Sequence, residues 1–161
     1  MSVETKLLNK LAYHDGLTGL LNRTSYMETV EQLKNTIEQD VLVAIFDIND
    51  LKKVNDTYGH QKGDEMIKRV AEAIQKELGT FGKCYRVGGD EFVFISEEKE
   101  AERKFMQIKD KLSTEYGELS INADKKIKIT VAVGYSVKNK DIHLSIEDII
   151  KEADSKMYCM K

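Results

Sequence analysis

The segment RVGGDEFVFI, residues 86–95, places two glycines and two carboxylates immediately before an apolar run. Gly88 and Gly89 favour a tight turn, and their bare backbone would let a bulky phosphate approach. Asp90 and Glu91 are unusual residues with which to enter a strand. Because Gly-Gly-Asp turns are common, the pattern alone favours an ordinary hairpin turn with solvated acids.

A third acid, Asp47, follows the continuous apolar run VLVAIF at 41–46, which is typical of a central strand buried on both faces. If that strand neighbours the hairpin, the carboxylates of Asp47 and Asp90 converge at one edge of the sheet. Paired acids repel each other, and a divalent cation removes the conflict. Mg²⁺ takes few protein carboxylates and completes its shell with water and phosphates. Two such ions, about 4 Å apart, would suit a phosphoryl displacement.

The stretch after Asp47, DINDLKKVNDTYGHQKGDE, supplies further polar groups near the same edge. Lys52 can pair with phosphate, while Asn55 and Asp64 can make directed hydrogen bonds. A carboxylate at Asp64 can accept from N1–H and the 2-amino group of guanine, and a site built for those bonds rejects adenine. The alternatives are a turn residue for Asn55 and, for Asp64, an acid favoured by the helix dipole.

Hydrophobic periodicity and capping residues predict the elements that position these groups. The predicted helices are 3–13, with Leu7, Leu8 and Leu11 on one side; one capped by Asn22 or Thr24 and running to about Gln39; 50–57; a longer helix after Gly59; 98–116; and 145–158, capped by Ser145. The predicted strands are 41–46, 127–138 and a pair flanking Gly88-Gly89. This alternation predicts an α/β fold around one sheet that contains a hairpin.

Composition narrows the class of protein. A chain of 161 residues suits one domain, and 41% apolar with 33% charged residues indicates a soluble globular protein. The net charge of −3, without a basic block, argues against nucleic acid as partner. No apolar run is long enough to cross a bilayer, and the N-terminus lacks a signal-peptide core. Cys84 and Cys159 suggest neither a disulfide nor a zinc site, so we expect a cytoplasmic protein.

Three motifs in order, DGLTGLLNR, FDINDLKKVNDTYGHQKGDE and RVGGDEF, resemble the GGDEF domain of diguanylate cyclases. The resemblance extends from about residue 12 to Lys161. It implies a largely antiparallel central sheet flanked by helices, like class III nucleotide cyclases and polymerase palms. It also implies two parts: an N-terminal linker or signalling helix, 1–13, and a catalytic domain, 14–161. Such a domain is compatible with a piece excised from a longer sensor protein.

The resemblance implies two Mg²⁺ or Mn²⁺ ions per active site. Asp47 and Asp90 would be side-chain ligands, and Ile48 would add its backbone carbonyl. Glu91 would assist deprotonation of the 3′-hydroxyl and help to hold metal. Arg86 matches an arginine placed to influence the site.

The same resemblance assigns the substrate contacts. Asn55 and Asp64 would read guanine, while Lys52 and the backbone of Asp50 and Leu51 would hold phosphate. Gly88 and Gly89 would line the substrate, and Lys161, in the closing ADSKMYCMK, would contact the triphosphate.

The implied reaction joins two GTP molecules into cyclic di-GMP and releases two pyrophosphates. One domain holds one GTP, so a second copy of the domain must face it, and a membrane would be involved only through another part of a longer protein. Two other functions are alternatives: a domain that binds GTP or product without turnover, and a cyclase that makes cyclic mononucleotides. The intact acids disfavour the first, and the match of Asn55 and Asp64 to the dinucleotide family disfavours the second.

Two positions depart from the family pattern. Many relatives carry an RxxD product-inhibition site before the glycine motif, where this chain has Gly79 and Gly82 within GTFG. We therefore predict no tight product feedback at that surface. In the DGLTGLLNR connector, Asp15 and Arg23 are expected to hold the segment by an ion pair rather than to touch substrate.

Overall fold

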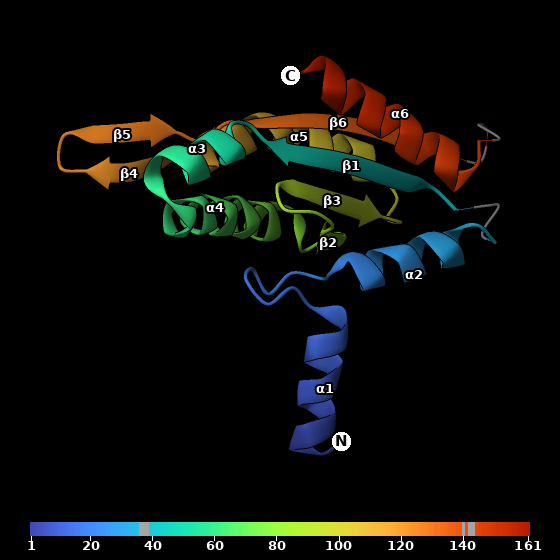
Figure 1. Cartoon of the computed structure of the whole chain (residues 1–161). Coiled ribbons are helices and arrows are strands. Elements are labelled where there is room, and N and C mark those ends of the chain that lie inside the picture. Colours follow the sequence, from blue (N-terminus) through green and yellow to red (C-terminus); the bar gives the residue numbers. More distant parts are fainter. Residues whose placement is uncertain (36–38, 140, 142–143) are drawn as a thin grey trace.

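The computed structural model describes residues 1–35, 39–139, 141 and 144–161. Its centre is a four-stranded sheet in the order β2-β3-β1-β6, in which every neighbouring pair is antiparallel (Figure 1). The strands are β1 (Val41–Ile48), β2 (Lys83–Arg86), β3 (Glu91–Ser96) and β6 (Val131–Lys138). The predicted antiparallel α/β architecture is confirmed, and a parallel pairing occurs as an isolated bridge between Leu21 and Tyr85.

Strand β1 is buried along its whole length, as its unbroken apolar run predicted. Successive side chains alternate between the two faces of the sheet. Leu42, Phe46 and Ile48 enter one hydrophobic core, whereas Val43 and Ile45 enter a second. Since Asp47 continues the second series, the pleat directs it to the face covered by the C-terminal helix.

Helices cover both faces of the sheet (Figure 1). Helices α3 (Leu51–Tyr58), α4 (His60–Leu78) and α5 (Ala101–Glu115) pack on one core, and α2 (Arg23–Leu33) and α6 (Ile146–Cys159) pack on the other. Helix α4 buries one apolar side, which includes Met66, Ile67, Val70, Ala73, Ile74 and Leu78. Helix α6 begins with a capping box between Ser145 and Asp148, which fixes its start as predicted.

The predicted single strand 127–138 is wrong. The chain forms β5 (Lys125–Lys128), which pairs with the unpredicted β4 (Glu118–Asn122) in a separate hairpin, and only afterwards enters the central sheet as β6. Between them Ile129 is buried, and its N–H donates to the Gly117 carbonyl at 3.0 Å. That bond continues the β4–β5 ladder by one pair, and the hairpin projects away from the body (Figure 1).

Two predicted helix boundaries also differ. Asn22 caps α2 by accepting from the Ser25 N–H at 3.0 Å, but the helix ends at Leu33 instead of near Gln39; residues 36–38 lie outside the described part. Helix α5 begins at Ala101 because Glu100 has φ 63°, a left-handed conformation that cannot extend the helix backwards.

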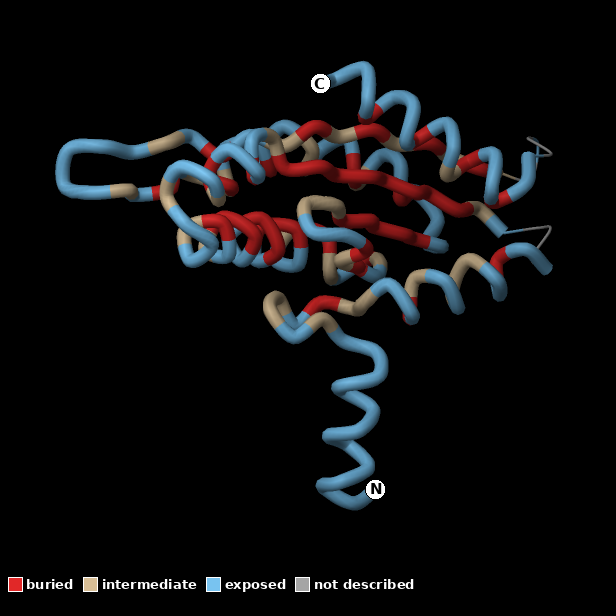
Figure 2. The backbone as a smooth tube through the Cα atoms, viewed as in Figure 1, coloured by how far each residue is buried: buried red, intermediate tan, exposed pale blue. Residues whose placement is uncertain are grey.

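Helix α1 (Val3–Tyr13) stands away from the body with no buried residue (Figures 1 and 2). Its predicted apolar side is present but uncovered, since Leu7, Leu8 and Leu11 are 56%, 60% and 71% exposed. Within the described ranges, no helix has the length and apolar character needed to span a membrane.

Candidate active site

The sheet brings the predicted acids together. Asp47, at the end of β1, lies directly opposite Glu91 at the start of β3. The next residue, Ile48, donates its N–H to the carbonyl of Asp90 at 2.9 Å. Asp47 and the consecutive acids Asp90 and Glu91, distant from it in sequence, therefore lie at one edge of the sheet, as the sequence predicted for Asp47 and Asp90.

Two of the three carboxylates, Asp90 and Glu91, have raised pKa values. The pKa of Asp90 is raised by burial and then by the adjacent Asp47, with Lys161 opposing the shift. The pKa of Glu91 is also raised, by burial first and then by Asp154, Asp47 and Asp90. This mutual repulsion is what a bound cation relieves.

The donor set around Asp47 fits a hard divalent cation. Asp47 is 8% exposed; its Oδ2 accepts from the Lys161 ammonium at 2.7 Å, while its buried Oδ1 has no hydrogen-bond partner. A buried carboxylate oxygen without a partner is costly. Among the residues that the structure describes, no three acidic, histidine or cysteine side chains form an all-protein metal cage. Two carboxylates beside an open cleft instead match the way Mg²⁺ binds, which leaves room for water and phosphate.

A cleft of about 470 Å³ opens beside these acids. It is lined by Ile48, Asn49, Asp50, Leu51, Lys52, Asp90, Thr130 and Lys161. Helix α3 starts here without a side-chain cap, so the N–H groups of its first turn are free to bind an anion. Asp50 precedes the helix in a left-handed conformation, φ 64°, and local strain of this kind is concentrated at functional sites.

Thr130 was not singled out from the sequence. Its hydroxyl accepts from the Asn49 side chain at 3.0 Å, and its carbonyl accepts from the Asn49 N–H at 2.9 Å. These bonds join the start of β6 to the loop that follows β1, and so hold one wall of the cleft. The available signal is the change from alternating to continuous apolar residues near 130, which is also typical of a strand interior.

The backbone of the glycine turn does not need the conformational freedom that the sequence suggested. Gly88 and Gly89 do not adopt the left-handed conformation, so the turn does not require glycine for its own backbone. A Cβ on Gly89 would meet nothing within 4 Å, and one on Gly88 would meet only the Glu91 Cβ at 3.6 Å. The missing side chains instead leave open space over an exposed backbone, where a ligand could approach.

Arg86 lies behind this turn. Its Nη2 donates to the Gly89 carbonyl at 3.0 Å, and its Nη1 pairs with Asp15 at 3.2 Å. The expected ion pair of Asp15 in the connector is therefore made with Arg86, whereas Arg23 donates to the Val87 carbonyl at 3.1 Å. Both arginines support the turn from the connector side.

The predicted guanine-reading pair lies on the neighbouring helices α3 and α4. The Asn55 side chain packs directly over Gly63, because a Cβ there would collide with its amide. The Asn55 Oδ1 is buried without a hydrogen-bond partner, and the exposed Asp64 follows Gly63 in sequence. The two residues are thus neighbours, but neither lines the cleft beside Asp90.

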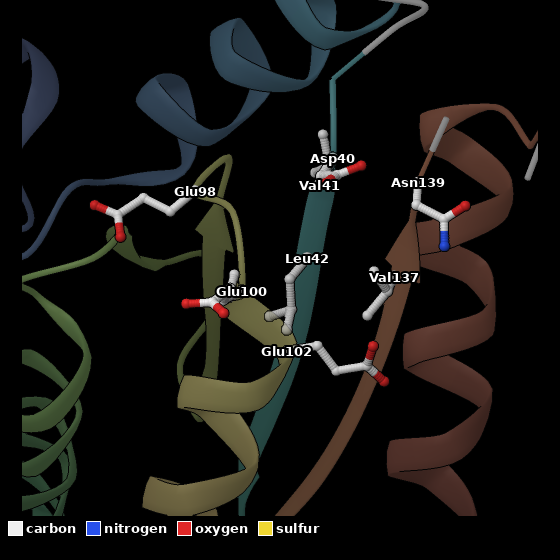
Figure 3. A pocket seen from close by; sticks show the side chains of 9 residues that line it. Asp40, Val41, Leu42, Glu98, Glu100, Glu102, Val137 and Asn139 are labelled. Atoms are coloured by element: carbon white, nitrogen blue, oxygen red, sulfur yellow. The ribbon is translucent and has the colours of Figure 1, made fainter. Parts of the chain in front are cut away.

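A second acidic hollow, of about 160 Å³, lies at the opposite end of β1 (Figure 3). Its carboxylates point in different directions, and two have basic partners: Glu98 with Lys104 at 2.8 Å and Glu100 with Arg103 at 3.0 Å. These carboxylates therefore do not meet at one point as Asp47 and Asp90 do.

Comparison with known proteins agrees with this geometry. Residues 12–161 match the family described as "Diguanylate cyclase, GGDEF domain", so the chain belongs to the GGDEF family. The chain is 30% identical to the diguanylate cyclase DgcN of Escherichia coli over 96% of its own length and 38% of that protein's. It is 29% identical to the cyclic di-GMP phosphodiesterase PdeB of Shewanella oneidensis, over 91% and 17% of the respective lengths. The chain thus spans less than two-fifths of these relatives.

A similar solved structure is that of the coiled coil and GGDEF domain of DgcB from Caulobacter crescentus in complex with c-di-GMP. It superposes with a TM-score of 0.82 at 25% identity, covering 97% of this chain and 84% of that one. The antiparallel sheet with flanking helices is therefore the nucleotide cyclase, palm-like fold.

Proposed function

We propose that this domain is a diguanylate cyclase, which condenses two GTP molecules into cyclic di-GMP and releases two pyrophosphates. One observation carries the proposal. Asp47 and Asp90 meet beside a cleft, and a buried oxygen of Asp47 has no partner. In an active domain, that oxygen would face a metal ion.

Asp47, Asp90 and the Ile48 carbonyl would hold Mg²⁺ or Mn²⁺, two ions per site, with Glu91 close by. When bound, the metal would neutralise the carboxylates and polarise the reacting phosphate. The raised pKa of Glu91 supports its role as acceptor of the 3′-hydroxyl proton, because such a group holds a proton more readily than a solvated glutamate.

The triphosphate would lie at the start of α3. The backbone of Asp50 and Leu51 would donate to it there, and Lys52 and Lys161 line the same cleft with positive charge. The open space over Gly88 and Gly89 would admit the substrate backbone.

Guanine would be read on the α3–α4 side of the site. The unpartnered Asn55 oxygen and the exposed Asp64 carboxylate would accept its N1–H and amino groups. The domain would align the 3′-oxygen of one GTP with the α-phosphorus of another. Because each copy offers one such site, a second copy must present the other GTP.

In the whole protein, residues 1–13 would serve as a signalling helix that brings two copies of the domain 14–161 together, consistent with the uncovered apolar side of α1. The domain would act in the cytoplasm, and any contact with a membrane would come from other parts of a longer protein.

A second candidate is a domain that binds GTP without turnover and regulates a partner. The observation in its favour is Asp50, whose exposed carboxylate lies at the phosphate end of the cleft and would oppose the substrate's charge. Product analysis separates the two candidates.

The test is to incubate the protein with GTP and Mg²⁺ at rising protein concentration and to identify products by chromatography. A cyclase gives cyclic di-GMP with a specific rate that climbs with protein concentration. Asp90→Ala should abolish the product while the circular dichroism spectrum is retained, and Asp124→Asn, on the distant hairpin, should not. GTP binding without product would favour the second candidate, and equal use of ATP would contradict the guanine assignment.

A further inference from the structure

The cation nearest the proposed metal site belongs to the chain itself. Lys161 reaches Asp47 from just beyond the end of α6, with its Nζ 2.7 Å from Oδ2. A lysine side chain is ordinarily charged at neutral pH, and here it faces a carboxylate. Asp47 is thus partly neutralised before any metal arrives.

The unpartnered Oδ1 of Asp47 is open to one of the two proposed ions, but an ion that binds Oδ2 must compete with the ammonium already there. A Mg²⁺ ion binds a carboxylate oxygen at about 2.1 Å. An ammonium 2.7 Å from that same oxygen would lie within about 5 Å of the ion, and two positive charges at that separation repel each other in a partly buried site.

The lysine is also able to leave. Its side chain is 38% exposed, and it lines the cleft in which the triphosphate is proposed to bind. Its backbone N–H donates to the Tyr158 carbonyl at 3.1 Å, so the main chain is held while the long side chain can rotate. Phosphate would offer the displaced ammonium a new anionic partner.

We infer that Lys161 is an internal counter-ion that the metal must displace from Asp47, and that nucleotide drives the exchange by accepting the lysine. This inference rests on the proposed metal site but not on turnover. Before nucleotide binds, Lys161 lowers metal affinity; afterwards it adds to the affinity for the triphosphate. Metal and nucleotide would therefore favour each other's binding through this residue, in addition to direct chelation.

The test measures Mn²⁺ binding to the nucleotide-free protein from the electron paramagnetic resonance signal of free Mn²⁺. Lys161→Gln should bind Mn²⁺ about three- to tenfold more tightly than the unaltered protein, the effect of losing one charge-assisted partner. Lys151→Gln, an exposed change of equal charge on the same helix, should leave the affinity unchanged. Asp47→Asn should remove the binding, which locates the measured ion.

A second titration adds the GTP analogue with a methylene group between the α and β phosphorus atoms. The advantage of Lys161→Gln should then vanish or reverse, because the lysine has already moved to the phosphates. Equal or weaker Mn²⁺ binding by the nucleotide-free variant, an equal gain in Lys151→Gln, or an advantage that persists with the analogue would each overturn the inference. No step of this test requires product, so a domain without turnover could still support it.

Discussion

Arg86 holds Asp15 at 3.2 Å, and with its other terminal nitrogen it holds the carbonyl of Gly89 in the turn. Burial alone would raise the pKa of Asp15, but hydrogen bonds from Thr18 and the charge of Arg86 outweigh it and lower that pKa. The connector at the start of the domain is thereby fixed to the glycine turn beside Asp90.

We expect Asp15→Asn to lower the free energy of unfolding by about 1–2 kcal/mol, since it weakens a partly buried charged pair. It should also reduce turnover, because the turn loses its support. Urea denaturation and initial rates measure the two effects.

Arg86→Lys serves as the companion variant. It keeps the charge but cannot reach Asp15 and Gly89 together, because lysine lacks the planar fork of arginine. If this variant retained full turnover, positioning of the turn by Arg86 would be refuted.

The paired acids should make the metal-free fold less stable than it could be. We expect Asp90→Asn to raise Tm by about 1–4 °C in the absence of metal, because it removes repulsion with Asp47. Excess Mg²⁺ should then raise Tm in the unaltered protein and leave the variant unchanged. Differential scanning calorimetry in chelator and in Mg²⁺ provides the measurement.

The pH dependence follows from the same shift. The folded pKa of Asp90 lies above the unfolded value of about 3.9, so the folded state holds the extra proton between the two values. The protonated, neutral Asp90 stabilises the fold at pH values below both pKa values, and this stabilisation is lost as the pH rises through the folded pKa. The Tm advantage of Asp90→Asn should therefore grow as pH rises from about 4 and then level off. An advantage that shrank over this range would mean that the direction of the shift is wrong.

Gly63 offers a way to test the placement of Asn55. We expect Gly63→Ala to displace the Asn55 amide and to weaken GTP binding by roughly tenfold. Stability should hold or rise, since alanine favours a helix over glycine by up to about 1 kcal/mol. Gly16→Ala is the control, because its Cβ would meet nothing within 4 Å. Calorimetric titration with GTP and ATP analogues would show whether guanine preference falls with affinity.

The loop before β2 should not bind product tightly. A Cβ on Gly82 would collide with the Phe94 ring and the Ile95 carbonyl, and one on Gly79 would collide with the Gln75 carbonyl. Neither position has room for a gripping side chain. We expect initial rates to be unaffected by cyclic di-GMP at low micromolar concentration. Inhibition in that range that is abolished by mutating this surface would show the opposite.

Local signals predicted much of this fold and site. The apolar run before Asp47 located the central strand, the Gly-Gly pair located the hairpin, and Ser145 located the start of the last helix. These features are encoded by neighbouring residues, so periodicity and capping rules reach them.

Other features depend on contacts across the fold. The segment divides into β5 and β6 because its two parts pair with different strands, β4 and β1, although its apolar character continues through the break. The partner of Asp15 is 71 residues away, so no local pattern could choose Arg86 over Arg23. The same is true of Thr130, whose bond to Asn49 spans 81 residues.

The closeness of α6 to the sheet has a further consequence. A Cβ on Gly134 in β6 would run into the backbone of α6 at Ala153 and Met157, so the helix rests directly on the bare strand. Lys161 follows this helix and pairs with Asp47 at 2.7 Å. A methyl group added at Gly134 would push the last turn of α6 away from the sheet. The Lys161 ammonium would then move away from the Asp47 carboxylate. Substitution of Gly134 would thus alter metal binding, although Gly134 contacts neither the metal nor the nucleotide in the proposed site.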